Sequence, residues 1–188
     1  FARKIHVEAS RMIQLVNDIL QLSHLDNVSE TGAAPAMETV DLLDVARECV
    51  ERQKVNARHS YISLTYLGES APVTGSRVLL DELCQNLCDN AIRYNRPGGK
   101  VQIITACTRD GHCTLTVKDN GIGIPKEAQT SVFERFYRVD KSRSKATGGT
   151  GLGLAIVKHI ARIHNARIKL DSVVDEGTTI TVIFETAS

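Results

Sequence analysis

The segment Gly148–Leu154, which reads GGTGLGL, has the composition of a phosphate-binding loop. Four of its seven residues are glycine, and the apolar-patterned segment AIVKHIARI follows without a break. Glycines let the backbone approach a ligand closely, and the N-terminus of a helix presents unpaired N–H groups and a positive dipole end to an anion. The pattern therefore predicts a phosphate site. For this segment alone, a flexible linker that happens to precede a helix is the alternative.

A second group of polar residues lies within 76–94, a segment with helical periodicity. Asn86, Asn90 and Arg93 follow one another at spacings of four and three, so they project from one face of a helix. Amide oxygens are hard donors that suit Mg²⁺, which prefers to share its ligands with substrate phosphates. We expect these amides to suit a Mg²⁺ ion and Arg93 to supply positive charge one turn further on. Three solvated polar residues are the alternative.

Asp119 ends an apolar-patterned strand and is followed closely by Gly121 and Gly123. An ionised carboxylate only accepts hydrogen bonds, so it can receive one from an exocyclic amino group such as that of adenine. An Asp-Asn-Gly turn with no binding role is the alternative.

Basic residues dominate the segment 132–149, where only Glu134 and Asp140 oppose Arg135, Arg138, Lys141, Arg143 and Lys145. A connection of about 25 residues is longer than usual, which indicates a functional lid over about residues 124–149. We expect Phe133, Phe136 and Tyr137 to anchor it to the core. A solvated run of charges is the alternative.

The remaining pattern predicts the elements that position these residues. We expect helices over 1–26, 40–55 (capped by Asp41), 76–94 and 150–164, and strands over 61–67, 101–108, 112–119, 167–173 and 178–184. This order predicts an α+β fold, a two-layer α/β sandwich in which three helices cover one sheet, preceded by one long bundle-type helix. The expected domain organisation is a partial helical bundle over 1–27, a linker over 28–37 and the main domain over 38–188.

The first helix carries more apolar surface than a lone helix can expose. Alternating spacings of four and three link Ile5, Ala9, Met12, Val16 and Ile19, and further apolar residues widen this face. Such a face favours a four-helix bundle, completed by partner helices or a second copy of the chain. A helix folded back onto the following domain is the alternative.

Composition limits the remaining classes of function. The chain has 188 residues, 23 Lys+Arg against 22 Asp+Glu, and no Trp, so neither net charge nor aromatic content indicates a nucleic-acid partner. No apolar run approaches the ~18 residues of a membrane helix. The five cysteines form no CxxC pair, and we expect reduced thiols in a cytoplasmic domain. Because the chain starts with Phe1, we expect a piece of a longer protein. We expect this parent protein to be membrane-anchored.

Taken together and in this order, the motifs resemble the ATP-binding domain of sensor histidine kinases of two-component systems. NLCDNAIRYN is similar to the N box of that family, DNGIGIP to its G1 box, VFERFYRVD to its F box and GGTGLGLAIVK to its G2 box. The resemblance covers residues 38–185. Residues 1–26 resemble the second helix of the dimerisation and phosphotransfer bundle.

This resemblance implies ATP as substrate, Mg²⁺ as cofactor, a receiver domain of a response regulator as partner, and a homodimer formed through the N-terminal helix. It implies catalytic roles for Asn86, Asn90 and Arg93, with Asn90 as the Mg²⁺ ligand, Tyr94 on the nucleoside and Asp119 on the adenine. The other nucleotide-binding positions that it implies are Gly121, Gly123, Ile124, Tyr137, Arg138, Gly149, Thr150, Gly151, Leu152, Gly153 and Leu154.

The sequence departs from the family at the phospho-acceptor. In the family, a histidine precedes an acidic and then a basic residue, but none of the six histidines here has that context. We therefore expect a chain that binds ATP but cannot phosphorylate itself.

Two other functions remain as alternatives. One is an ATP hydrolase of the same superfamily, in which a glutamate base lies one helical turn before the metal-binding Asn. This chain has Asn86 at that position. An amide cannot take a proton from water, which argues against hydrolysis. The other alternative is a nucleotide-binding or dimerisation module without catalytic activity.

Overall fold

The computed structural model of the chain describes residues 2–31, 35–139 and 149–185. Its elements, in order, are α1 (Ala2–Thr31), β1 (Glu38–Asp41), α2 (Leu42–His59), β2 (Ser63–Gly68), β3 (Pro72–Gly75), α3 (Arg77–Arg93), β4 (Lys100–Cys107), β5 (Cys113–Asp119), the 3₁₀ turn η1 (Lys126–Ala128), α5 (Gly153–Ile163), β6 (Arg167–Val173) and β7 (Gly177–Phe184).

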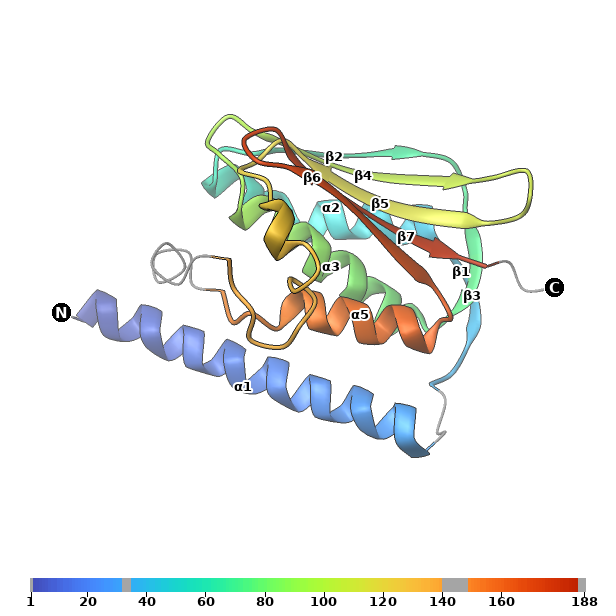
Figure 1. Cartoon of the computed structure of the whole chain (residues 1–188), viewed down its shortest axis with the longest axis horizontal. Helices are drawn as coiled ribbons and strands as arrows, with labels where there is room; N and C mark the ends of the chain where they lie inside the picture. The colour runs from blue at the N-terminus through green and yellow to red at the C-terminus, as the bar shows by residue number, and fades with distance from the viewer. Residues whose placement is uncertain (1, 32–34, 140–148, 186–188) are drawn as a thin grey trace.

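A five-stranded sheet forms one layer and three helices form the other. The strand order is β2-β4-β5-β7-β6, with β2 parallel to β4 and the other pairs antiparallel. Helices α2, α3 and α5 pack on the same face of this sheet (Figure 1). The predicted two-layer α+β sandwich is confirmed. A separate antiparallel pair, β1 with β3, was not expected from the sequence.

Helix α3 places the polar residues of the predicted site because its apolar side faces the sheet. Leu80, Leu83, Leu87 and Ala91 are buried in the common core, as the predicted apolar stripe requires. Asn86, Asn90 and Arg93 lie on the other side of the helix and are only partly buried. The apolar spacing of this segment therefore fixes which way the polar face points.

Helix α1 packs back onto the domain, which the sequence left as an alternative. It lies along α5 (Figure 1) and buries Leu22 and Leu25, which are 3% and 1% exposed. The predicted bundle face points elsewhere, since Met12, Val16 and Ile19 are exposed. The helix also continues to Thr31, through residues expected to belong to a linker. No helix within the described ranges is both long and apolar enough to cross a membrane.

The cysteines differ in part from the expectation of reduced thiols. Cys107 and Cys113 form a disulfide at the end of the β4–β5 hairpin, so the expectation is wrong for this pair. The two residues face each other in the ladder, a proximity that the sequence does not show. Cys49, Cys84 and Cys88 are free and buried, as expected.

Candidate nucleotide site

A cavity of about 810 Å³ lies between α3, the sheet and the loop that precedes α5. Fourteen predicted site residues line it, and they come from four separate segments of the sequence: Asn86, Asn90, Arg93, Tyr94, Asp119, Gly123, Ile124, Tyr137, Arg138, Gly149, Thr150, Gly151, Gly153 and Leu154. The other two predicted residues lie next to the cavity. Gly121 contacts Asp119 through its backbone, and Leu152 is fully buried in the core.

At one end of the cavity lie side-chain amides whose oxygens accept no hydrogen bond from the described residues. Asn86 donates through Nδ2 to the Glu82 carbonyl at 3.0 Å, which leaves its Oδ1 free. The Asn90 side chain makes no hydrogen bond with the described residues. The first residue of α5 packs against this pair so closely that a Cβ on Gly153 would lie 3.0 Å from Asn86 Oδ1. A side chain at position 153 would crowd the Asn86 amide, so glycine favours this close approach.

The loop before α5 also closes over the end of α3. A Cβ on Gly149 would lie 2.9 Å from Arg93 Nη1 and 3.3 Å from the Tyr94 hydroxyl oxygen. The Thr150 hydroxyl accepts a hydrogen bond from the Leu152 N–H at 3.3 Å. Helix α5 begins at Gly153, three residues later than expected, so that its first N–H groups open toward the cavity. Positive charge, helix N–H groups and amide oxygens thus meet at one end of the cavity.

Asp119 lies at the opposite end. Its Oδ1 accepts hydrogen bonds from the N–H groups of Gly121 at 2.8 Å and Thr178 at 3.3 Å. Oδ2 receives no hydrogen bond from the described residues and is available to a ligand. Burial raises the pKa of Asp119, and the two backbone N–H groups oppose this effect. The carboxylate is held in one orientation by the backbone and has one acceptor oxygen left.

Gly123 gives this end of the cavity its shape. Its φ is +68°, and a Cβ would lie 2.0 Å from the Val173 carbonyl oxygen. A side chain at this position would therefore collide with the turn that joins β6 and β7.

The predicted lid is only partly described. Its first half is fixed to the domain, because Ile124 donates to Ser172 Oγ at 2.8 Å and Phe136 donates to the Gly151 carbonyl at 2.9 Å. Phe136 is 59% exposed, so the prediction that it anchors the lid through its ring is wrong. Its backbone makes the contact instead. Residues 140–148, with Lys141, Arg143 and Lys145, lie outside the described residues.

Several polar residues that line the cavity were not predicted, and three of them are informative. Gln14 and Asp18 enter from α1, and Thr178 enters from β7. Thr178 follows Gly177 in the DEGTT turn, so the position of that turn could have indicated it. No signal in the sequence connects Gln14 or Asp18 with the cavity, because their place depends on how α1 packs.

The donor set fits a hard cation that shares its ligands with phosphate. In the part of the chain that the structure describes, no group of three or more His, Cys, Asp and Glu side chains could hold a metal ion. The free oxygen of Asn86 and the unbonded amide of Asn90 remain as donors at the loop end. Such a site would need further oxygens from phosphate and water, as Mg²⁺ prefers.

Comparison with known proteins agrees with this geometry. Residues 75–188 match the family described as histidine kinase-, DNA gyrase B- and HSP90-like ATPase. The chain is 44% identical to the sensor-like histidine kinase SenX3 of Mycolicibacterium smegmatis, over 97% of this chain and 47% of that protein. It is 38% identical to the sensor protein kinase WalK of Staphylococcus saprophyticus, over 92% of this chain and 28% of that protein. The mycobacterial sensor histidine kinase MprB superposes with a TM-score of 0.68 at 32% identity, covering 79% of this chain and 97% of that structure.

The chain therefore belongs to the family of histidine kinase-, DNA gyrase B- and HSP90-like ATPases. Within that family it carries the ATP-binding domain of the histidine kinase type, as the resemblance of its motifs predicted. It spans about half the length, or less, of the curated relatives it matches.

Proposed function

We propose that this chain binds Mg·ATP and positions the γ-phosphoryl group for transfer to a histidine of a separate acceptor helix. The observation that carries the proposal is that one cavity has a hydrogen-bond acceptor at one end and groups suited to phosphate at the other. Asp119 offers a single free carboxylate oxygen at one end. At the other end, Asn86 and Asn90 meet the start of α5, and Arg93 meets Gly149 in the preceding loop. An adenine nucleotide has matching ends, a hydrogen-bond donor on its base and anions on its phosphates.

The residues of the chain would act mainly by positioning and by neutralising charge, which is what phosphoryl transfer requires. Asp119 Oδ2 accepts a hydrogen bond from the adenine amino group and sets the position of the base. Arg93 and the first N–H groups of α5 stabilise the negative charge of the phosphates. Tyr94 contacts the nucleoside, and Tyr137 and Arg138 contact the nucleotide from the lid side.

Mg²⁺ would be held by Asn90 and would supply further charge neutralisation on the phosphates. Asn86 keeps an oxygen free beside it, and its position lacks the carboxylate that would activate water. The geometry therefore favours transfer to a histidine over hydrolysis.

The remaining parts of the proposal concern the assembled protein. A receiver domain of a response regulator would accept the phosphoryl group in turn, and the parent protein would be a homodimer formed through α1. The exposed Met12, Val16 and Ile19 support a further partner for this helix. We propose a cytoplasmic location for this domain in a membrane-anchored parent, and no nucleic-acid partner.

Calorimetry with ATP and GTP tests the role of Asp119. Because the free oxygen lies in a half-buried site, Asp119→Ala should weaken Mg·ATP binding by about 30- to 700-fold, which corresponds to ~2–4 kcal/mol. The wild type should bind ATP more tightly than GTP, whose base presents a carbonyl at the equivalent position.

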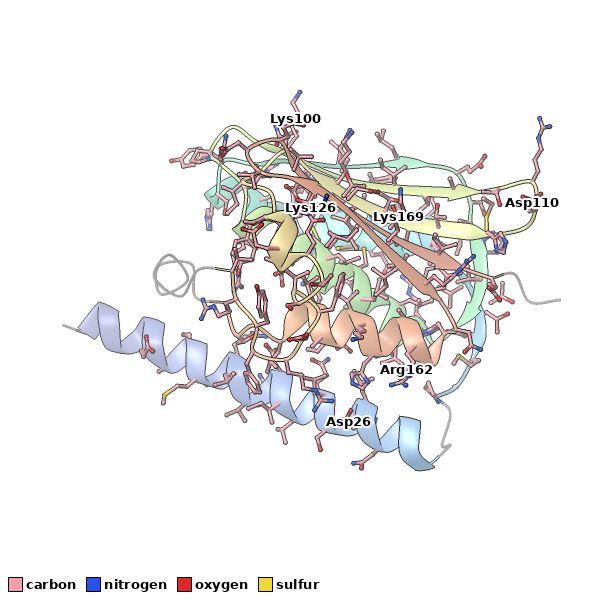
Figure 2. All side chains as sticks on the ribbon, in the orientation of Figure 1. Asp26, Lys100, Asp110, Lys126, Arg162 and Lys169 are labelled. Atoms are coloured by element: carbon pink, nitrogen blue, oxygen red, sulfur yellow. A yellow bond between two sulfur atoms is a disulfide. The ribbon has the colours of Figure 1, made fainter. Side chains whose placement is uncertain are left out.

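Asp110→Ala is the matched control, since Asp110 lies in the exposed β4–β5 turn, far from the cavity (Figure 2). It should leave both affinities unchanged. Equal affinity of the wild type for ATP and GTP would contradict the assignment of Asp119.

A further inference from the structure

A carboxylate from α1 lies at the end of the cavity that we assign to phosphate. Asp18 Oδ2 accepts a hydrogen bond of 2.6 Å from the Thr150 hydroxyl, and its Oδ1 accepts one of 2.8 Å from Gln14. Both Asp18 and Gln14 line the same cavity as Asn86 and Asn90. Asp18 is only 6% exposed. A nearly buried negative group therefore contacts the glycine-rich loop directly.

Among the residues that the structure describes, no cation pairs with this carboxylate. Its two hydrogen-bond partners are an amide and a hydroxyl, both neutral. Two other acidic side chains, Glu82 and Asp89, lie near enough for the charge of Asp18 to raise their pKa values. A phosphate brought to Thr150 would meet a like charge in surroundings that screen it poorly.

Helix α1 holds Asp18 in place through contacts elsewhere. Arg135 Nη2 contacts both oxygens of Asp26, at 2.7 and 2.8 Å, and His159 Nε2 lies 3.2 Å from Asp26 Oδ1. Figure 2 shows Asp26 on the side of α1 that faces α5. Leu22 and Leu25 are buried between Asp18 and this ion pair along the helix. The docking of α1 therefore keeps the backbone of Asp18 beside the loop.

We propose that Asp18 discriminates between nucleotides by their number of phosphates. While α1 is docked, the Asp18 carboxylate accepts the hydrogen bond of the Thr150 hydroxyl and fills the space beside it. The terminal phosphate of a nucleoside triphosphate needs both this hydroxyl and this space. A diphosphate is shorter and carries less charge, so it binds with α1 in place. A triphosphate binds fully only when α1 leaves, and by reciprocity its binding weakens the docking of α1 by the same factor. This inference rests on the proposed nucleotide site.

Binding of Mg·ATP, Mg·ADP and AMP to Asp18→Asn tests the proposal. The asparagine is isosteric and removes only the charge. The ratio of ATP affinity to ADP affinity should rise by about five- to tenfold in this variant, the range of a modest coupling between sites. AMP affinity should not change.

Asp171→Asn is the matched control, because it removes the same charge from an exposed edge strand and should leave the ratio unchanged. Asp26→Asn loosens α1 without touching the cavity, and it should raise the ratio by a smaller factor. Thermal unfolding confirms that each variant is folded.

Amide hydrogen exchange of the wild type gives a second, independent measurement. Mg·ATP should speed exchange of the amides over residues 15–25 more than Mg·ADP does, because it displaces the helix. An unchanged affinity ratio in Asp18→Asn, or equal exchange with both nucleotides, would overturn this inference while ATP binding itself stands. If the wild type binds neither nucleotide, the proposed function fails, and this inference fails with it.

Discussion

His164 joins the end of α5 to the start of α3 through both of its ring nitrogens. Nδ1 contacts the Ile160 carbonyl at 2.7 Å as a donor, and Nε2 accepts from the Ser76 N–H at 3.0 Å. The ring of Phe184 packs edge-on against it. Burial lowers the pKa of His164, while the bond to Ile160 opposes this. A neutral imidazole fits both contacts, whereas a protonated one would place a second N–H against Ser76.

The stability of the protein should therefore fall in acid through this residue. Since the pKa of His164 is below 6.5 in the folded chain, the unfolded chain binds more protons as the pH falls. The contribution of neutral His164 to the free energy of unfolding is present above pH 6.5 and is lost as the pH falls below this value. Urea unfolding between pH 7.5 and 5 should show a smaller decline in His164→Gln than in the wild type. At pH 7.5 the variant should be about 1–2 kcal/mol less stable.

His59→Gln is the control, because His59 is exposed at the end of α2. It should follow the wild-type pH profile. A His164→Gln profile parallel to that of the wild type would show that this histidine does not titrate on unfolding.

At the scale of elements, the carboxyl group of Glu82 on α3 is buried next to α1, where its ionised form is unfavourable. Burial raises the pKa of Glu82 to about 7, a hydrogen bond with Gln21 opposes this, and the charge of Asp18 adds to it. Glu82 Oε1 is buried and has no hydrogen-bond partner among the described residues. Both Gln21 and Asp18 belong to α1, but they act in opposite directions: the charge of Asp18 makes ionisation of Glu82 costly, whereas the hydrogen bond from Gln21 favours it.

Glu82→Gln should stabilise the chain at pH 8. The pKa of Glu82 is raised from 4.5 to about 7 on folding, so the folded chain holds an extra proton between these values. Stability then falls as the pH rises from 4.5 to 7, which is opposite in sign to the effect of His164. In urea unfolding, the advantage of the variant should be largest above pH 7 and should vanish near pH 4.5.

Glu51→Gln provides the comparison, since Glu51 lies on the exposed side of α2 beside Lys54. It should show no such dependence on pH. If Glu82→Gln is less stable than the wild type at pH 8, the carboxylate must be favourable in the docked interface.

The sequence was sufficient to predict those helices and strands whose apolar spacing distinguishes a helix from a strand. Helices α3 and α5 and the hairpins β4–β5 and β6–β7 lie where their patterns placed them, within a few residues. The strands β1 and β3 were missed because each has only four residues and is stabilised by the other, 30 or more positions away. Helix α1 carries two apolar faces, and only tertiary packing decides that the face with Leu22 and Leu25 is covered.

The same limit applies to the candidate site. Motifs on α3, β5 and the loop before α5 were sufficient to predict fourteen of the residues that line the cavity, because each motif places several polar or glycine residues within a few positions. Asp18 could not be predicted, since it is an ordinary polar residue on an amphipathic helix until that helix is placed. Phe136 was misjudged because its backbone contacts Gly151 while its ring is exposed.

At the scale of the whole molecule, we predict that this chain does not phosphorylate itself when incubated with labelled ATP and Mg²⁺. None of the histidines whose side chains the structure describes lines the cavity. His159 lies against Asp26 and Arg135, and His164 is hydrogen-bonded to Ser76. In-line transfer needs the imidazole within about 3–3.5 Å of the γ-phosphorus. Acid-labile label should therefore be absent from the chain.

Addition of a polypeptide that carries a histidine followed by an acidic and a basic residue on a helix able to pair with α1 should restore transfer. Acid-labile label on the isolated chain, lost when one of its own histidines is replaced, would show that an acceptor is present here.

The disulfide at the tip of the β4–β5 hairpin also determines what a break in the backbone would do. Cys107 and Cys113 enclose the exposed residues Arg109 and Asp110, and Figure 2 shows Asp110 at the tip of this hairpin. The basic side chain of Arg109 is a cleavage site for trypsin-like proteases. A cut after Arg109 would divide the chain into a piece with α3 and a piece with Asp119 and α5. These pieces hold opposite ends of the cavity, yet one covalent bond would keep them together. A nicked molecule could therefore remain one particle until a reductant separates it.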